Sequence, residues 1–390
     1  MKRLTHKPRP GWRDIIRRQG LVYNDTPAAD GQVLDYWQEE AAYHFTAAEI
    51  ETLEHTTAEL FEMCVAAGDH LLESGRWRQL GIPEAALPAI TATWNDDLAP
   101  SLYARFDLRY DGTGPAKLLE FNADTPTSLL ESAVVQWFWL QDTHPQSDQW
   151  NSLHEALIAA WKRHQANGRL GTGLVHLAST GAETSGEDLF TTLYLQDTAQ
   201  QAGLETHYLT MEAIGRDRTG QLVDDASRPI SHLFKLYPWE WLLKEVFGST
   251  ALASMAQGSV TWVEPVYKML WSNKGILPIL WELYPDHPNL LPAYFDDPGP
   301  LASYAAKPLL GREGEGIQLI QNGRKLASGV GANAIGRRVY QGLAPLPDFD
   351  GHHPVLGVWL VDGEPAGLGI RESTSLITDN VARFVPHVID

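Results

Sequence analysis

The sequence of 390 residues predicts a mixed fold of the α+β or α/β class, and three observations support this prediction. Apolar residues recur at helical spacing through much of the first hundred residues. A strand–helix–strand pattern follows in the middle of the chain. From about Tyr304 onward, alternating strands separated by tight turns predict antiparallel hairpins. Because no linker rich in Gly and Ser interrupts the chain, we expect its lobes to pack against one another.

Composition excludes several classes of protein. The chain has 30 Lys and Arg against 49 Asp and Glu, a formal net charge of −19, which argues against a nucleic-acid partner. The acidity is compatible with a cationic small partner, although solubility alone is the favoured explanation. The single cysteine, Cys64, excludes a disulfide framework and a zinc site of paired cysteines. No apolar run is long enough for a membrane span, and the basic start lacks a secretory pattern, so we expect a cytoplasmic protein.

The helices and the first strands follow from local signals. Thr46 to Glu49 forms a capping-box pattern, and apolar residues at helical spacing, Cys64 among them, continue to about Ser74. Pro83 to Leu87 opens another short helix. Further helices are predicted over residues 127–140, 150–167, 188–203, 238–247 and 274–284. Strands are predicted over residues 174–178, 206–209 and 230–236, and turns at Gly311 to Gly316, Asn322-Gly323 and Asp362-Gly363.

Residues 102–122 predict a hairpin with acidic residues on one face. Alternation along its two strands places Asp107 opposite Glu120, and Arg105 opposite Asn122. Facing carboxylates repel each other, and a divalent cation between them would reverse the sign of that interaction. Carboxylate and amide oxygens are the ligands that Mg²⁺ takes together with phosphate oxygens. The alternative is a solvated hairpin face on which Arg109 or Lys117 neutralises the acids.

A turn rich in hydroxyl groups follows this hairpin and leads into a helix. Thr127 or Ser128 is placed to cap that helix, and the positive end of a helix attracts anions. A metal-binding acidic cluster beside a helix N-terminus would suit the activation of a phosphate or a carboxylate.

Two later hairpins carry glycines and cations. Lys307 precedes a loop containing Gly311, Gly314 and Gly316, where backbone N–H groups could approach a phosphate. Taken alone, the loop slightly favours the alternative of a plain hairpin. In the last hairpin, Gly367 and Gly369 alternate on one strand and predict close packing against its backbone. Arg371, at the end of that strand, would clamp a phosphoryl group or simply pair with Glu372.

Together these segments resemble the synthetase domain of the glutathionylspermidine synthase family, whose members are ATP-grasp ligases, and in particular its stand-alone acid–amine ligase members. The resemblance spans nearly the whole chain in order. It rests on residues 105–107, 120–128, 235–240, 264–278, 307–314 and 369–372.

The resemblance implies an ATP-grasp-like fold with the nucleotide held between lobes, and it implies roles for individual residues. Asp107, Glu120 and Asn122 would bind Mg²⁺, and Lys274 and Lys307 would contact the phosphates of ATP. Gly311, Gly314 and Gly316 would cover the nucleotide, and Tyr340 and Gln341 would contact the adenine. Arg105 and Arg371 would stabilise the acyl phosphate, and Thr125 and Thr127 would lie near a peptide substrate.

The implied organisation is one synthetase unit, residues 1–390, without the amidase domain of the bifunctional enzymes. Its approximate lobes are a helical segment 1–100, the hairpin and helices 101–170, a βαβ-like substrate lobe 171–265 and an ATP-grasp lobe 266–390.

The implied activity joins a peptide or amino-acid carboxylate to a polyamine-like amine through an acyl phosphate. Glu187 and Asp188 are candidate amine-docking residues, although they would equally serve as the solvated start of a helix. The alternatives are a nucleotide-binding protein of this fold without ligase activity, and a Mg²⁺-dependent phosphatase. The latter leaves Lys307 and the glycine loop unexplained.

Overall fold

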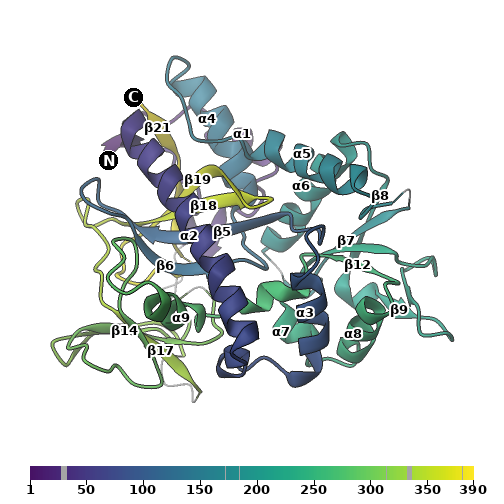
Figure 1. Ribbon diagram of the computed structural model, residues 1–390. Helices are drawn as coiled ribbons and strands as arrows, with labels where there is room; N and C mark the ends of the chain where they lie inside the picture. Colours follow the sequence, from purple (N-terminus) through teal and green to yellow (C-terminus); the bar gives the residue numbers. More distant parts are fainter. Residues whose placement is uncertain (28–32, 172, 184, 313, 332–335, 380) are drawn as a thin grey trace.

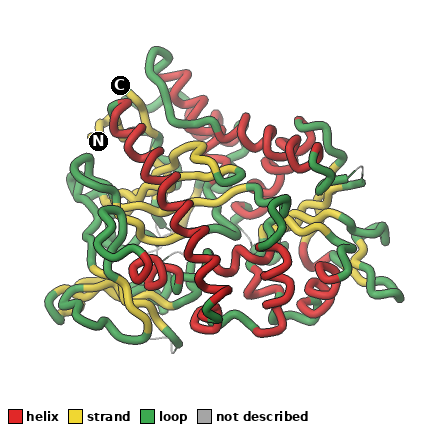
Figure 2. The backbone as a smooth tube through the Cα atoms, viewed as in Figure 1, coloured by secondary structure: helices red, strands yellow, loops and turns green. Residues whose placement is uncertain are grey.

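The computed structural model describes residues 1–27, 33–171, 173–183, 185–312, 314–331, 336–379 and 381–390. In this part of the chain, helices and several separate sheets are packed together, which confirms the mixed α+β prediction (Figure 2). In Figure 1 an antiparallel sheet containing β5, β18 and β19 lies at the centre. The sheet of β7, β8 and β12 lies to its right, and the sheet of β14 and β17 lies at the lower left.

The N-terminal segment corrects the prediction of a helical first lobe. The residues described before position 47 form one seven-residue helix, α1 (Trp12–Arg18), and four short strands: β1 (Lys2–Thr5), β2 (Asp25–Pro27), β3 (Val33–Asp35) and β4 (Ala41–Phe45). Strand β4 pairs with β1 on one side and with β21 (His387–Ile389) on the other. Strand β4 therefore pairs with a strand from the opposite end of the chain, which a local pattern cannot reveal.

The long helix α2 (Ala47–Glu73) confirms the first predicted helix. The Thr46 side chain accepts a hydrogen bond from the amide of Glu49, whose own side chain accepts one from the Thr46 amide, as a capping box requires. The Cys64 thiol is buried among the apolar residues of the inner face. Pro83 leads into a short 3₁₀ turn (Glu84–Ala86) and then α3 (Leu87–Trp94), as predicted.

The central sheet has the strand order β20-β19-β18-β5-β6. Its strands are β5 (Tyr103–Arg109), β6 (Lys117–Asn122), β18 (His353–Val361), β19 (Glu364–Ser373) and β20 (Arg383–Val385). The register of β5 and β6 places Asp107 opposite Glu120 and Arg105 opposite Asn122, which confirms the predicted hairpin. A Cβ atom on Gly369 would lie 2.3 Å from Ser132 Oγ, so the glycine prediction of close backbone packing is also confirmed.

The parallel sheet has the order β12-β11-β7-β8 and contains the predicted βαβ unit. Strand β7 (Val175–Ser179), helix α6 (Glu187–Gln201) and strand β8 (Thr206–Thr210) follow one another, and the two strands pair in parallel. Strands β11 (His232–Leu236) and β12 (Thr261–Val263) complete the sheet. Helix α5 (Leu153–Ala166) packs beside α6, and a ribbon of β9 (Gly215–Arg216) and β10 (Leu222–Val223) follows β8.

The third large sheet has the order β13-β17-β14-β15-β16, all antiparallel. It consists of β13 (Ala293–Phe295), β14 (Tyr304–Pro308), β15 (Gln318–Gln321), β16 (Arg324–Ser328) and β17 (Arg338–Gly342). Together with β18 and β19 it confirms the predicted C-terminal hairpins. The remaining α-helices of the described residues are α4 (Gln136–Thr143), α7 (Trp239–Leu242), α8 (Gly248–Ala256) and α9 (Ile276–Leu283). A π-helical turn (Glu131–Val135) precedes α4. Short 3₁₀ turns lie at Arg76–Leu80, Met211–Ala213 and Val266–Leu270.

Among the residues described, none of the helices has both the length and the apolar character that a membrane crossing requires.

Candidate functional site

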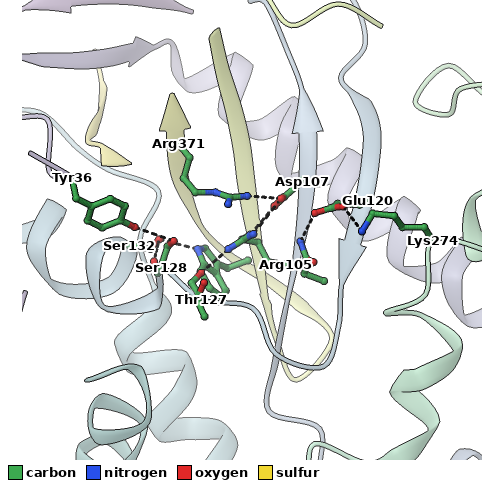
Figure 3. Close-up of polar contacts among 11 residues, drawn as sticks. Tyr36, Arg105, Asp107, Glu120, Thr127, Ser128, Ser132, Lys274 and Arg371 are labelled. Atoms are coloured by element: carbon green, nitrogen blue, oxygen red, sulfur yellow. Dashed lines mark hydrogen bonds and ion pairs between the residues drawn. The ribbon is translucent and has the colours of Figure 1, made fainter. Parts of the chain in front are cut away.

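Two guanidinium groups hold the Asp107 carboxylate (Figure 3). Arg105 donates from Nε to Asp107 Oδ1 at 2.6 Å, and Arg371 donates from its terminal nitrogen to Oδ2, also at 2.6 Å. Arg105 shares a face of β5 with Asp107, whereas Arg371 reaches across from β19 over the intervening strand β18. Gly357 of β18 leaves room for the Arg105 side chain, because a Cβ atom there would lie 2.8 Å from Arg105 Cδ.

The other cations and acids nearby have different partners, which corrects two alternatives from the sequence. Arg109 pairs with Asp111 at 2.8 Å, and Lys117 donates to the carbonyl of Pro288, so neither neutralises the facing acids. Glu372 is paired with Arg3 at 2.7 Å and is therefore not the partner of Arg371.

Glu120 faces Asp107 across the hairpin and is paired with Lys274. The distance from Lys274 Nζ to Glu120 Oε2 is 3.0 Å, and Asn122 Nδ2 donates to the other carboxylate oxygen at 3.2 Å. Burial alone would raise the pKa of Glu120, but Lys274 and Lys307 hold it well below its ordinary range. Lys274 Nζ also donates to the carbonyl of Gly311 at 2.8 Å, so it links the acidic hairpin to the glycine loop.

Lys307 extends from β14 to the same hairpin. Its Nζ donates to the carbonyl of Leu119 and to Gln341 Oε1, both at 2.8 Å. Burial lowers the pKa of Lys307 to about 8, although Glu120 opposes the shift. Lys307 and Gln341 are thus brought together. Tyr340 does not join them, because alternation along β17 turns its ring toward Tyr304, with ring centroids 5.4 Å apart.

A pocket lies between the central sheet and the sheet of β14 and β17. Its polar end is formed by Asp107, Glu120, Lys307, Gln341 and Arg371. The rest of the wall is mainly apolar and comes from β14 to β16, the segment after β17 and the segment after β19: Ala305, Ile317, Leu319, Leu326, Leu343, Leu346, Leu376 and Ile377. This shape suits a ligand with one flat apolar part and one anionic part.

The glycine loop closes one side of the pocket. Gly314 lines it and has a φ of 71°, a conformation that a side chain would strain. Gly316 also has a positive φ, and Gly311 contributes the carbonyl that Lys274 contacts. Residue 313, within the predicted turn, lies outside the described part of the chain.

The hydroxyl-rich turn after β6 does not cap its helix as predicted. Ser128 has a φ of 70°, whereas a capping residue has an extended backbone, and its hydroxyl is 3.2 Å from the hydroxyl of Tyr36. The carbonyl of Thr127 accepts a hydrogen bond from Arg105 at 2.5 Å, and the Thr125 hydroxyl accepts one from Arg312. The turn therefore orients Arg105 and Arg312 rather than exposing a helix N-terminus.

Sequence reasoning missed the residues that anchor this turn. Asp124 accepts hydrogen bonds from Lys235 Nζ at 2.7 Å and from the amide of Trp239 at 3.0 Å. Lys235 on β11 is fully buried, so the pair joins the parallel sheet to the site. Both residues lie in segments that carry the family resemblance, but no local pattern indicates that they pair.

A second missed residue is Glu131, which is fully buried next to the site. Its carboxylate faces the hydroxyl groups of Tyr23 and Tyr36, which partly offset the effect of burial on its pKa. Burial and the nearby charge of Glu187 raise the pKa of Glu131 to about 7. An acidic residue within the apolar run from Leu129 to Leu140 was the available signal. Glu187 and Asp188 both occupy the first turn of α6 and are half-buried.

The donor set of the hairpin fits a magnesium ion. Asp107 and Glu120 supply carboxylate oxygens, and Asn122, whose Nδ2 is engaged by Glu120, keeps its amide oxygen as a ligand atom. The cations around the two carboxylates are more numerous than the acids: Arg105, Arg371, Lys274 and Lys307. This excess of positive charge suits a polyanionic ligand rather than a free cation.

Residues 3–390 match the family described as "Glutathionylspermidine synthase preATP-grasp". The chain belongs to this family. Members of the glutathionylspermidine synthase family are synthetases, which are ligases that form amide bonds.

Several named proteins are similar over much of their length. A Haemophilus influenzae protein named "Putative acid–amine ligase" is 38% identical over an alignment of 404 positions, which covers 99% of each chain. The Escherichia coli "Bifunctional glutathionylspermidine synthetase/amidase" is 26% identical over 93% of this chain and 61% of its own. The "Trypanothione synthetase" of Crithidia fasciculata is 28% identical over 84% of this chain and 56% of its own. The chain thus spans somewhat more than half the length of these two synthetases.

One solved structure supports the fold. A glutathione synthetase-like effector from Globodera pallida has a TM-score of 0.53 over 99% of this chain and 100% of that one, at 10% identity. At this level of identity the likeness concerns the arrangement of the chain alone.

Proposed function

We propose that the protein is an ATP- and Mg²⁺-dependent ligase that joins a peptide or amino-acid carboxylate to a polyamine-like amine. The observation that carries this proposal is the pocket whose apolar walls lead to a cluster of four cations around two facing carboxylates. Family membership supplies the reaction class, and the pocket supports a nucleoside triphosphate as the energy source. The ATP-grasp fold, with residues 1–390 as one unit and the lobes named above, is part of the same proposal.

The apolar part of the pocket suits an adenine ring, held near Gln341 and the segment after β17. Lys274 and Lys307 would then neutralise the phosphates, which lie toward Asp107 and Glu120. Magnesium held by Asp107, Glu120 and Asn122 would supply charge neutralisation on the phosphate oxygens.

The reaction in this proposal has two steps. The substrate carboxylate attacks the γ-phosphate of ATP and displaces ADP, which gives an acyl phosphate. The unprotonated amine then attacks the carbonyl carbon of the acyl phosphate, inorganic phosphate leaves, and loss of a proton from nitrogen gives the amide. Arg105 and Arg371 would orient the carboxylate and stabilise charge on the transferring group, and the glycine loop would exclude water from an intermediate that hydrolyses readily. Thr125 and Thr127 would border the acid substrate beside Arg105.

The amine would bind on the other side of the hydroxyl-rich turn, near Glu187 and Asp188. The Tyr36–Ser128 contact joins that side to Arg105 through the adjacent Thr127. Glu131 adds a buried carboxylate whose raised pKa reflects burial and the neighbouring acid. A cationic amine would relieve this unfavourable accumulation of negative charge.

The test measures ADP release from Mg-ATP with a panel of glutathione, related peptides and amino acids, each with and without polyamines. The proposal predicts release that requires both an acid and an amine, with mass spectrometry showing the amide. Glu120→Gln should abolish release, whereas Asp111→Asn, an acid at the turn of the same hairpin, should not. No ADP above background across the panel would contradict the proposal.

The amine site has its own measurement. Glu187→Gln should raise KM for the polyamine and leave KM for ATP unchanged, and Glu155→Gln, at the exposed start of α5, should change neither. Equal KM values for the polyamine in both variants would place the amine elsewhere. If Mg-ATP binds tightly and no acid–amine pair supports turnover, the alternative of a nucleotide-binding protein without ligase activity is favoured.

A further inference from the structure

Three histidines meet where the two ends of the chain lie side by side. His6 follows β1, His44 lies on β4, and His144 follows α4. Figure 1 shows that α4, β21 and both termini occupy the same end of the molecule. One ring nitrogen from each of the three histidines lies within 4.8 Å of the others. None of the three lines the pocket at Asp107.

Hydrogen bonds set the tautomers of two of these rings. His44 Nδ1 is 3.0 Å from both carboxylate oxygens of Asp390, and an ionised carboxylate only accepts, so Nδ1 carries the proton. His144 Nδ1 is 2.9 Å from the hydroxyl of Thr143, which already donates its proton to the carbonyl of Trp139 at 2.7 Å. His144 is therefore also protonated at Nδ1. In both rings the lone pair resides on Nε2, which is the form that binds metals.

One pair of ring nitrogens already has the spacing of a tetrahedral metal site. Zinc binds imidazole nitrogen at about 2.0–2.1 Å, so two nitrogens on one tetrahedral ion lie about 3.3 Å apart. His6 Nε2 and His44 Nε2 are 3.3 Å apart. Without a metal ion this contact is a hydrogen bond that His6 donates to His44, and the proton of His6 moves to Nδ1 when a metal ion takes its place. His6 and His144 are only half-buried, so their rings have room to complete the geometry.

A metal ion binds imidazole through an unprotonated ring nitrogen, and the hydrogen bonds to Asp390 and Thr143 leave Nε2 of His44 and of His144 in that form. The outer partners Asp390 and Thr143 fix the ring orientations, as outer hydrogen bonds do in known metal sites.

The other described group of three metal-ligand side chains is His207, Asp224 and Asp225, and it is unsuitable. The two oxygens of Asp224 already accept hydrogen bonds from the amides of Ala226 and Arg228, from the Arg228 side chain and from His176. Few lone pairs remain there for an ion.

We propose that His6, His44 and His144 bind one divalent transition-metal ion of the zinc class, with Asp390 and Thr143 as outer-shell partners. Three neutral imidazoles suit zinc better than magnesium, which prefers oxygen ligands. The ion would tie together the N-terminal segment, β4, the end of α4 and the segment after β21. Its role is structural and separate from the ligase site.

The experiment uses the full chain after chelation and dialysis, with Mg²⁺ in excess to occupy the oxygen donors at Asp107 and Glu120. Zinc is titrated by calorimetry, and bound metal is counted by mass spectrometry after gel filtration. We expect one zinc ion per chain and a higher midpoint of thermal unfolding. His6→Gln and His144→Gln should each weaken binding at least tenfold, and His55→Gln, an exposed histidine on α2, should not.

Asp390→Asn provides a second test that does not threaten folding, because this side chain is 60% exposed. It should weaken zinc binding by roughly 10- to 100-fold while circular dichroism stays unchanged. Cobalt substituted for zinc should show visible d–d absorption that both histidine variants lose. The proposal is overturned if micromolar zinc does not bind, or if binding survives in His6→Gln and His144→Gln but is lost in His207→Gln. None of these measurements depends on ATP turnover.

Discussion

Replacing Arg371 with alanine separates a chemical role from a structural one. The change removes one charge-assisted hydrogen bond, 2.6 Å long, to Asp107, worth about 1.5–3 kcal/mol of unfolding free energy. Arg105 still contacts both carboxylate oxygens, so Asp107 is not left unpaired and the loss stays within that range. An arginine that stabilises a transferring phosphoryl group contributes about 10³–10⁵ in kcat, equivalent to roughly 4–7 kcal/mol. Activity should therefore fall far more than stability.

The assay compares ADP release and urea unfolding for Arg371→Ala, Arg371→Lys and Arg3→Ala. Arg3 pairs with Glu372, the next residue on the same strand, and its loss breaks a more buried ion pair. Arg3→Ala should lower stability at least as much as Arg371→Ala and retain activity. Arg371→Lys should have intermediate activity, because lysine keeps the charge and loses the planar fork. If folded Arg371→Ala keeps activity within tenfold of the unmodified protein, or if Arg3→Ala loses as much, the reasoning is wrong.

Three further outcomes are expected. Because the folded protein lowers the pKa of Lys307 to about 8, kcat/KM for ATP should be retained below that pH and fall above it as the ammonium is lost. Lys307→Arg should remove this fall at alkaline pH. An identical pH profile in both proteins would contradict the role of Lys307. Gly369→Ala places a Cβ atom 2.3 Å from Ser132 Oγ and should destabilise the protein by about 1–3 kcal/mol in chemical unfolding, whereas Gly336→Ala, with no atom within 4 Å, should not. Thr46→Ala should lower the free energy of unfolding by about 1 kcal/mol, because the capping hydrogen bond is lost. An unchanged midpoint of thermal unfolding would show that this hydrogen bond does not stabilise the protein.

The acidic hairpin was predictable because a strand has a period of two and a short turn sets the register. Both constraints act within twenty residues, so the sequence places Asp107 opposite Glu120 without further information. The cations that neutralise them were not predictable in the same way. Arg371 is 264 residues away from Asp107. The Arg105 side chain has its position because Gly357, on the next strand, carries no side chain.

Tertiary pairing also explains the errors at the N-terminus and in the hydroxyl-rich turn. Strands β1 and β4 are four and five residues long, and they exist because β21 at the other end of the chain completes their sheet. The pattern at Ser128 resembles a helix cap, but Asp124 is held by Lys235 from the parallel sheet, and Ser128 adopts a positive φ. A local preference worth about 1 kcal/mol yields to such buried contacts.

The sequence by itself determined the elements whose signals are local: the capping box at Thr46, the βαβ unit, the C-terminal hairpins and the facing acids. It also carried enough of the family pattern for the reaction class to be inferred. The tertiary structure alone decided which cations meet Asp107 and Glu120, that Gln341 and not Tyr340 faces the pocket, and that three histidines converge beside the termini. Short stretches of sequence determine the hydrogen bonds between near neighbours and the faces on which side chains lie. Ion pairs and clusters between distant segments form only when folding buries those segments together.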